Sequence, residues 1–219
     1  MRGQVRGAIV QLLERGEFVG TKVRDTAVAE RLGVSRTPVR EALLDLVRTG
    51  ELVSDHGRGF QVAPLDPAEI RELGQMLGAL ESLALRLSDP CSPSRLEELE
   101  RLIFEIESAR GDALLVLDRN EQWHLALLEG CPNRLLRARL ADLRGATRRY
   151  VLAFLRGAGR LGLATGGHRR VLAALRDGAQ VAAAAALEEQ LVSGTDELAG
   201  WLARSAPQAL GNSRSSGSR

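Results

Sequence analysis

Aromatic residues are scarce in this 219-residue chain, which has four Phe, two Trp and one Tyr, together 3% of the sequence. So few rings argue against an all-β sandwich and against binding of single-stranded nucleic acid by base stacking. The abundant Ala, Leu and Arg favour helices instead. The length is sufficient for two modest domains, each with its own buried core.

Cysteine and long apolar runs are also rare. Cys91 and Cys131 are the only cysteines and have no C-x-x-C partner, so they suggest neither a zinc ribbon nor a disulfide scaffold. We expect inert thiols in a reducing cytoplasm. No apolar run is long enough to span a bilayer, and the N-terminus begins with a charged amphipathic segment instead of a signal peptide. The sequence therefore predicts a cytoplasmic protein with no membrane partner.

Net charge is low, and its excess is unevenly placed. The chain carries +2 in all, while residues 1–64 hold ten Lys or Arg against eight Asp or Glu, a difference that is also +2. A basic footprint this weak means that binding of nucleic acid would depend on where each arginine stands and not on bulk charge.

The most informative stretch is residues 31–50, RLGVSRTPVREALLDLVRTG, which predicts a turn followed by a helix. Gly33 permits the sharp turn, and Ser35 is a good N-cap for a helix that starts at Arg36. Pro38 then falls in the first turn, where the missing N–H costs nothing. Gly50 would end the helix.

The expected helix has two faces. Its apolar stripe consists of Val39, Ala42, Leu43, Leu46 and Val47. Arg36, Thr37 and Arg40 fall on the outward, N-terminal side, where guanidinium groups match guanine edges and phosphates. The alternative is an ordinary surface helix with solvated arginines.

The segment after this helix favours the DNA-binding interpretation. Residues 51–64 predict two short strands, Leu52–Ser54 and Phe60–Ala63, around a glycine-containing loop, which is a small β-hairpin wing. The motif GVSRTPVREAL followed by LV and GRGF, over residues 5–64, resembles the winged helix-turn-helix of the GntR family of bacterial transcription regulators.

That resemblance implies which residues contact DNA. Ser35, Arg36, Thr37 and Arg40 correspond to positions that contact phosphates and base edges. His56 and Gly57 correspond to the wing tip that reaches toward the minor groove. One departure concerns Thr26, which stands where some members have a DNA-contacting arginine.

The remaining N-terminal residues would support this helix. Residues 3–15 read as a first helix and residues 17–23 as a short edge strand, and Thr26 is the expected N-cap of a helix over residues 27–32. Two prolines mark a stiff linker at residues 63–67.

Beyond the linker the sequence predicts an antiparallel bundle of about six helices. The expected helices cover residues 67–87, 94–110, 112–129, 133–157, 165–177 and 179–203. The fold class is therefore mainly α, with a winged helix-turn-helix domain at residues 1–64, an all-helical domain at residues 65–204 and a disordered tail at residues 205–219.

The bundle carries a second resemblance. Residues 120–136, NEQWHLALLEGCPNRLL, and residues 168–178, HRRVLAALRDG, resemble the FCD domain of the FadR branch of that family. The resemblance covers about residues 65–203. It implies a domain that binds small organic acids or related metabolites, frequently around a metal held by one aspartate and three histidines.

The positions that correspond to those four ligands are Asn120, His124, His168 and Gln190. Because the carboxylate and one imidazole are replaced by amides, a divalent metal such as zinc or nickel would be held weakly, chiefly by the two histidines. The arginine that many members place on the first bundle helix is replaced by Leu77.

Three interpretations of the two bundle histidines stay open. They form a metal site with changed ligands, a metal-free effector pocket built with Asn120 and Gln190, or core polar groups in a pocket that no longer responds. Trp123 fits core packing, while Arg148 and Arg149 would either reach a pocket anion or lie on a solvated face.

The sequence lacks the residues that catalysis would need. The two cysteines and the serines form no recognisable catalytic constellation with the three histidines, so the sequence predicts no enzyme. We expect a regulator, most simply a repressor, whose homodimer binds a palindromic double-stranded operator and is released by a small effector, including organic acids. The alternative is a ligand-independent regulator or an architectural DNA protein with a degenerate pocket.

Overall fold

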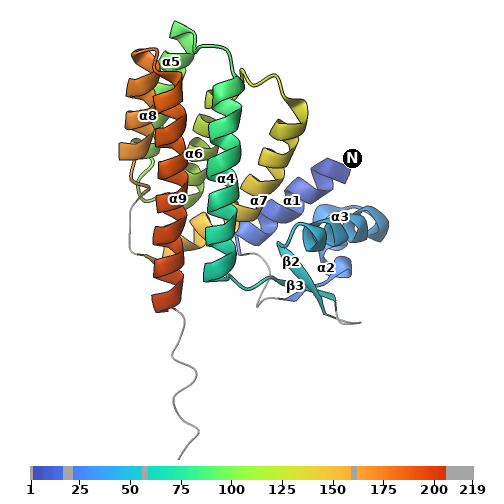
Figure 1. Ribbon diagram of the computed structural model, residues 1–219. Coiled ribbons are helices and arrows are strands. Elements are labelled where there is room, and N and C mark those ends of the chain that lie inside the picture. Colours follow the sequence, from blue (N-terminus) through green and yellow to red (C-terminus); the bar gives the residue numbers. More distant parts are fainter. Residues whose placement is uncertain (1, 17–21, 56–58, 159–161, 206–219) are drawn as a thin grey trace, which may run out of the picture.

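A computed structural model describes residues 2–16, 22–55, 59–158 and 162–205. Across these ranges the chain folds into a small N-terminal unit with a three-stranded sheet and a larger helical bundle beside it (Figure 1). The predicted mainly α fold is confirmed. The wing-tip residues His56 and Gly57, and the tail from residue 206 on, lie outside the described residues.

The N-terminal unit consists of three helices and the sheet. Its elements are α1 (Arg2–Glu14), β1 (Lys22–Val23), α2 (Asp25–Leu32), α3 (Arg36–Arg48), β2 (Leu52–Asp55) and β3 (Gly59–Val62). The strands are antiparallel in the order β1-β3-β2. Pairing of β2 with β3 forms the predicted wing, and each strand lies within one residue of its expected bounds.

One local prediction for this unit is wrong. α2 begins at Asp25, and its N-cap is Arg24 in an extended conformation, so Thr26 lies inside the first turn and is not the cap. Asp25 Oδ1 accepts a 2.8 Å hydrogen bond from the Thr26 amide, and a carboxylate in this position also suits the positive end of the helix dipole. The expected edge strand is confirmed only at Lys22–Val23, because residues 17–21 are outside the described ranges.

The bundle has six helices within the described residues. They are α4 (Pro67–Leu87), α5 (Pro93–Ser108), α6 (Ala113–Leu127), α7 (Arg134–Gly157), α8 (Gly166–Arg176) and α9 (Gln180–Ser205). Local caps explain several of the starts, because the side chains of Asp66, Ser92, Asp112 and Asn133 accept hydrogen bonds from first-turn amides. Ser205, which was expected to be the first residue of the tail, is the last residue of α9.

α4 and α9 run side by side for most of their length (Figure 1). A Cβ on Gly74 would lie 1.8 Å from Thr195 Oγ1, so this close approach requires glycine there, and a Cβ on Gly78 would be tight at 3.2 Å from Val192. The bundle core is dominated by Leu, Ile, Val and Ala and includes Trp123, which is 0% exposed as predicted. None of the described helices is long and apolar enough to cross a membrane.

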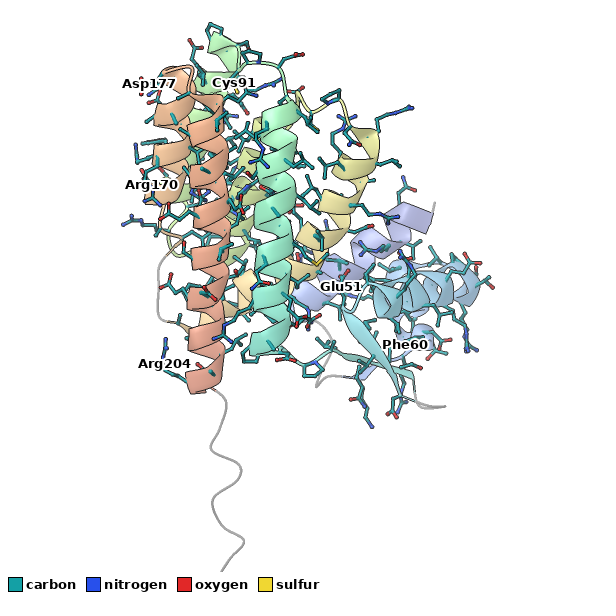
Figure 2. The ribbon with its side chains drawn as sticks, in the orientation of Figure 1. Glu51, Phe60, Cys91, Arg170, Asp177 and Arg204 are labelled. Carbon is teal, nitrogen blue, oxygen red and sulfur yellow. The ribbon has the colours of Figure 1, made fainter. Side chains whose placement is uncertain are left out.

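The N-terminal unit has a core of its own. Val39, Ala42, Leu43 and Leu46 of α3, the predicted apolar stripe, are each 0% exposed, and they pack with residues of α1, α2 and the sheet. The fifth stripe residue, Val47, is partly buried against them. Phe60 of β3 belongs to this core, while Cys91 lies at the far end of the bundle (Figure 2). Both cysteines are free.

Candidate functional site

The exposed end of α3 is the first candidate site. Ser35 is the N-cap residue, as predicted, although its side chain makes no capping hydrogen bond. Because the opposite face of α3 is buried in the core, the side chains of Arg36 and Arg40 stand out with 63% and 66% of their area exposed. Together with Thr37 they surround a shallow depression of about 300 Å3. The structure thus brings these predicted DNA contacts onto one open surface.

Asp25 holds both arginines and was missed by the sequence reasoning. Arg36 Nη2 donates a 3.0 Å hydrogen bond to Asp25 Oδ2, and Arg40 Nη1 lies 3.8 Å from the same oxygen. The hydrogen bond from Arg36 lowers the pKa of the Asp25 carboxyl, which therefore stays ionised. The carboxylate orients the two guanidinium groups, and it is an acidic group that competes with phosphate for them.

The second candidate site is a cavity of about 400 Å3 inside the bundle, which we call the His cavity. It is lined by all four residues that were predicted to form the pocket, Asn120 and His124 of α6, His168 of α8 and Gln190 of α9. Residues separated by up to 70 positions are thus brought together. Val151, Phe154 and Leu198 supply apolar walls.

His168 uses both of its ring nitrogens inside the protein. The Nε2 atom of His168 lies 2.9 Å from Asn120 Oδ1. The amide nitrogen of Gln190 lies 3.2 Å from His168 Nδ1 and 3.3 Å from His168 Nε2. An amide oxygen only accepts and an amide nitrogen only donates, so Nε2 carries the proton and Nδ1 accepts. Burial lowers the pKa of His168 well below its usual value. The imidazole is therefore neutral, with no lone pair to spare.

His124 is arranged differently. Its Nδ1 donates a 2.9 Å hydrogen bond to Glu81 Oε2 of α4, which leaves the lone pair on Nε2 for the cavity that His124 lines. The other oxygen of Glu81 accepts from Arg144 of α7. Glu81 is 0% exposed, so this carboxylate is fully enclosed and paired on both of its oxygens.

The charges in this cluster are fixed by burial and pairing. Burial raises the pKa of the Glu81 carboxyl, but the charge of Arg144 and the hydrogen bonds from His124 and Arg144 outweigh it and hold the pKa below its ordinary value. Burial lowers the pKa of His124, and the nearby positive charge of Arg144 lowers it further. The cluster at neutral pH thus contains an ionised Glu81–Arg144 pair and an uncharged imidazole.

These residues do not fit a divalent transition metal. His124 Nε2 is the one imidazole lone pair that faces the cavity, because Asn120 and Gln190 already hold both nitrogens of His168. Glu81, the carboxylate that contacts His124, is neutralised by Arg144. The part of the chain that the structure describes contains no group of three or more His, Cys, Asp or Glu placed to hold a metal ion. Of the three interpretations, the geometry disfavours the metal site with changed ligands.

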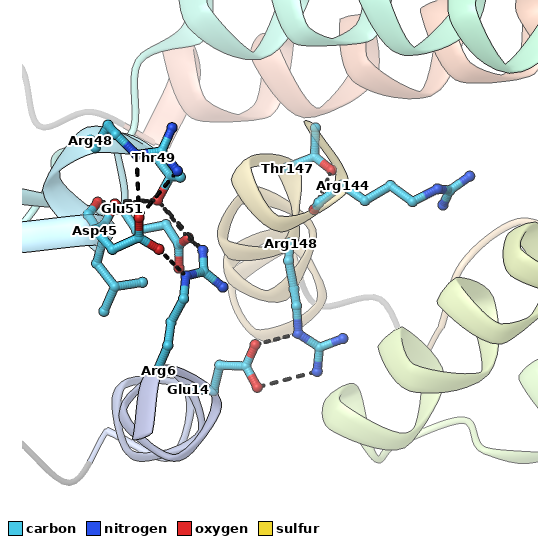
Figure 3. A network of polar contacts seen from close by, with 10 residues as sticks. Arg6, Glu14, Asp45, Arg48, Thr49, Glu51, Arg144, Thr147 and Arg148 are labelled. Carbon is cyan, nitrogen blue, oxygen red and sulfur yellow. Dashed lines mark hydrogen bonds and ion pairs between the residues drawn. The ribbon is translucent and has the colours of Figure 1, made fainter. Parts of the chain in front are cut away.

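α7 also joins the bundle to the N-terminal unit. Arg148 contacts Glu14 of α1 and lies 2.5 Å from both Asp118 and Glu121 of α6. Figure 3 shows the guanidinium of Arg148 turned toward Glu14, while Arg144 points away from both. With 18% of its side chain exposed, Arg148 does not lie on a solvated face, so that interpretation is wrong.

The neighbouring Arg149 holds the segment between the two parts. Its Nη1 donates to the carbonyl oxygens of Ala63 and Pro64 at 2.8 and 3.0 Å, and its Nη2 lies 2.7 Å from Glu69 Oε2. Its side chain is 15% exposed, so the solvated-face interpretation is wrong here as well. On the other side of the junction, Arg6 of α1 pairs with Glu51 at 2.5 Å (Figure 3). Glu51 lies where the N-terminal unit faces the bundle (Figure 2).

Two family descriptions match the chain. "Bacterial regulatory proteins, gntR family" matches residues 1–62, and "FCD domain" matches residues 72–193. The sequence is 32% identical over 111 residues to the HTH-type transcriptional regulator McbR of Escherichia coli (strain K12), which is 49% of this chain and 50% of the relative. It is 31% identical over 139 residues to the "Probable D-xylose utilization operon transcriptional repressor" of Paenarthrobacter nicotinovorans, which is 62% of each chain.

The chain therefore spans about half to three fifths of the length of these curated relatives. Among solved structures, that of E. coli McbR/YncC superimposes with a TM-score of 0.77 over 92% of this chain and 98% of the other, at 23% identity. At that identity the likeness is one of fold.

Proposed function

The chain belongs to the GntR family of bacterial regulatory proteins and carries an FCD domain, and from this premise we propose that it is an effector-controlled repressor. It is a DNA-binding transcriptional regulator and not an enzyme. In the proposal, a homodimer binds a palindromic operator through residues 1–64 and leaves it when a small metabolite occupies the His cavity in residues 65–204.

The exposed end of α3 supports the proposed DNA contacts. Arg36 and Arg40 are the bidentate donors for base edges or phosphates, with Ser35 and Thr37 beside them at the start of the same helix. A dimer with twofold symmetry would place two copies of α3 on the two half-sites of an inverted repeat. His56 and Gly57 are proposed to contact the minor groove from the wing tip.

The His cavity supports an uncharged, hydroxyl-bearing effector. Both histidines are neutral, and Arg144 is already paired with Glu81, so the buried end of the cavity has no free charge for a carboxylate. His124 Nε2 is a hydrogen-bond acceptor, which calls for an O–H or N–H group on the ligand. D-xylose is a neutral polyol of this kind, and the name of the P. nicotinovorans relative makes it the first compound to test.

The main observation that supports effector control is the set of contacts made by α7. One helix contacts the His cavity cluster through Arg144, the N-terminal unit through Arg148 and the linker carbonyls through Arg149. α6 also contacts both regions. Its Asn120 and His124 line the His cavity, and its Asp118 and Glu121 pair with Arg148. A shift of either helix on ligand binding would therefore reach α1 and the linker at residues 63–67.

The first experiment identifies the operator and then asks what releases it. Full-length protein would select binding sites from a library of random duplexes, and we expect an inverted repeat bound roughly 10³-fold or more tighter than random DNA. Fluorescence anisotropy of that operator would follow release during titration with D-xylose, other neutral sugars and simple carboxylates. Sedimentation of the complex would give the number of chains on each duplex.

A pair of variants on α6 makes the test specific. Asn120→Leu removes the partner of His168 and should abolish release by the effector while operator affinity stays unchanged. Gln122→Leu, two residues away on the exposed side of the same helix, should respond like the wild type. Equal affinity for random and selected DNA would instead favour an architectural protein, and release in Asn120→Leu would exclude the His cavity as the effector site.

A further inference from the structure

A second cavity, which we call the inter-unit cavity, lies between α1 and α7 and has a volume of about 450 Å3. It shares no lining residue with the His cavity. On α7 its lining residues recur every three to four positions along one face, from Ala141 to Arg156, and on α1 they include Val10 and Leu13. Leu65 of the linker segment also lines it. The cavity is thus walled by both parts of the molecule.

The void has the lining of a ligand pocket. Nine of its sixteen lining residues are apolar, Val10, Leu13, Leu65 and Leu152 among them, and the other seven are charged. Gly145 of α7 also lines the cavity, and a Cβ added there would meet no atom within 4 Å. The small residue is therefore not required by close helix packing. Cavities of this size with apolar walls and a few polar groups occur preferentially where two structural units meet.

Most of the charges around the inter-unit cavity are already paired. Arg6 pairs with Glu51, Arg148 with Glu14 and Glu121, and Arg149 with Glu69. A second charged ligand group would have to break one of these pairs. The internal pairing therefore limits the ligand to few charges.

Arg156 is the exception. It lines the cavity near the end of α7, it is exposed, and it makes no ion pair or side-chain hydrogen bond with any residue in the described part of the chain. A guanidinium at the edge of an apolar cavity complements a single anionic group, which it binds through two parallel N–H donors.

We propose that the inter-unit cavity is a second small-molecule site, which takes an organic anion with an apolar body of one or two rings and a single carboxylate or sulfonate. The apolar body fills the space between Val10, Leu13 and Leu152, and the anionic group meets Arg156. A ligand in this position contacts α1 and α7 together, so it binds the arrangement of the two units that the structure shows. The site is independent of the effector proposed for the His cavity.

The test is photolabelling of the full-length protein with 4-benzoylbenzoate, which has an apolar two-ring body, one carboxylate and a photoreactive ketone. Peptide mass spectrometry would locate the label. We expect saturable labelling of peptides from α1 and α7, Arg2–Glu14 and Arg134–Gly157. Arg156→Ala should lower the labelling at a subsaturating concentration by about two- to fivefold, as expected for one exposed charged contact. Ala153→Trp, which fills the cavity, should abolish it.

Two matched controls come from the His cavity. Arg170 is an exposed arginine and Ala164 an exposed alanine that both line it, so Arg170→Ala and Ala164→Trp should leave the labelling unchanged. Label found mainly in α8 and α9, or lost in Ala164→Trp, would overturn the proposal. Equal labelling of Arg156→Ala and wild type would contradict the proposal that the ligand is an anion bound by Arg156. Labelling by the uncharged 4-benzoylbenzamide that equals labelling by 4-benzoylbenzoate would contradict it as well. Because the readout involves no DNA, failure here leaves the proposed repressor function untouched.

Discussion

Arg144 and Arg148 lie one helical turn apart on α7 and serve two separate networks. Arg144 donates to the buried carboxylate of Glu81 behind the His cavity, whereas Arg148 bonds Glu14 of the N-terminal unit. Residues four positions apart in a helix share a face but reach different depths and neighbours. Here the turn between them separates a contact with the bundle interior from a contact with the DNA-binding part.

Loss of Arg148 should loosen α1. In Arg148→Met, Glu14 loses its partner, and hydrogen bonds to charged groups contribute about 1.5–3 kcal/mol each. We expect amide hydrogen exchange in α1 to become roughly tenfold faster or more, measured by mass spectrometry, with no change in α5. Arg139→Met, at the exposed start of the same helix with 75% of its side chain exposed, is the control. Unchanged exchange in α1 would show that Arg148 does not hold the two units together.

The exposed arginines of α3 should determine operator affinity. Arg36→Ala and Arg40→Ala are each expected to cost about 1–3 kcal/mol of binding to the selected operator, measured by fluorescence anisotropy at fixed salt. Arg48→Ala is the control variant for operator affinity, because Arg48 is 66% exposed on the same helix but pairs with Asp45 in its last turn. Wild-type operator affinity in both Arg36→Ala and Arg40→Ala would mean that another surface of the protein reads the DNA.

Helix bounds were predictable because the signals that set them are local. Pro67 in the first turn and the Asp66 cap fix the start of α4, whose observed span Pro67–Leu87 equals the predicted one. The start of α7 is also set locally. It was expected at residue 133 and is observed at Arg134, because Asn133 is the cap. The prediction of Thr26 as the N-cap of α2 was wrong, because the preceding Asp25 also favours the start of a helix and α2 begins there.

The candidate site was predictable only in part. The resemblance to the FCD domain selected Asn120, His124, His168 and Gln190, which do line one cavity. Glu81 and Arg144 were missed because 63 positions separate them, and burial of a charged side chain depends on a partner that no local pattern reveals. In the sequence each reads as an ordinary polar residue of a helix.

The buried pair gives a stability prediction. Arg144→Met leaves Glu81, which is 0% exposed, without its cation, and breaking a buried pair in this way typically costs about 3–5 kcal/mol. Urea unfolding at neutral pH would measure the loss. Arg176→Met breaks the pair with Glu100, in which both side chains are about half exposed, and should cost about 1 kcal/mol or less. Similar losses in the two variants would show that Glu81 is protonated or solvated in the folded protein.

Metal content tests the neutral character of the His cavity. Since His168 has both nitrogens engaged and Glu81 is held by Arg144, we expect far less than one transition-metal ion per chain in protein purified without a metal-affinity tag or chelator. Elemental analysis would measure it. About one ion per chain that disappears in both His124→Ala and His168→Ala would contradict the metal-free pocket.

Acid should destabilise the fold in two stages. His124 and His168 have pKa values below 6.5 in the folded protein, so the unfolded chain binds more protons as the pH falls through that value. The free energy of unfolding should therefore decrease from pH 7.5 to 5.5, with a slope of up to about 1.4 kcal/mol per pH unit for each histidine. Glu81, whose folded pKa lies below 4.5, adds a further decrease under that pH in the same direction. Urea unfolding at several pH values would follow both stages, and His168→Gln should reduce the slope of the first by about half. A free energy of unfolding that is constant between pH 7.5 and 5.5 would mean that the folded histidines titrate normally and are not neutral by burial.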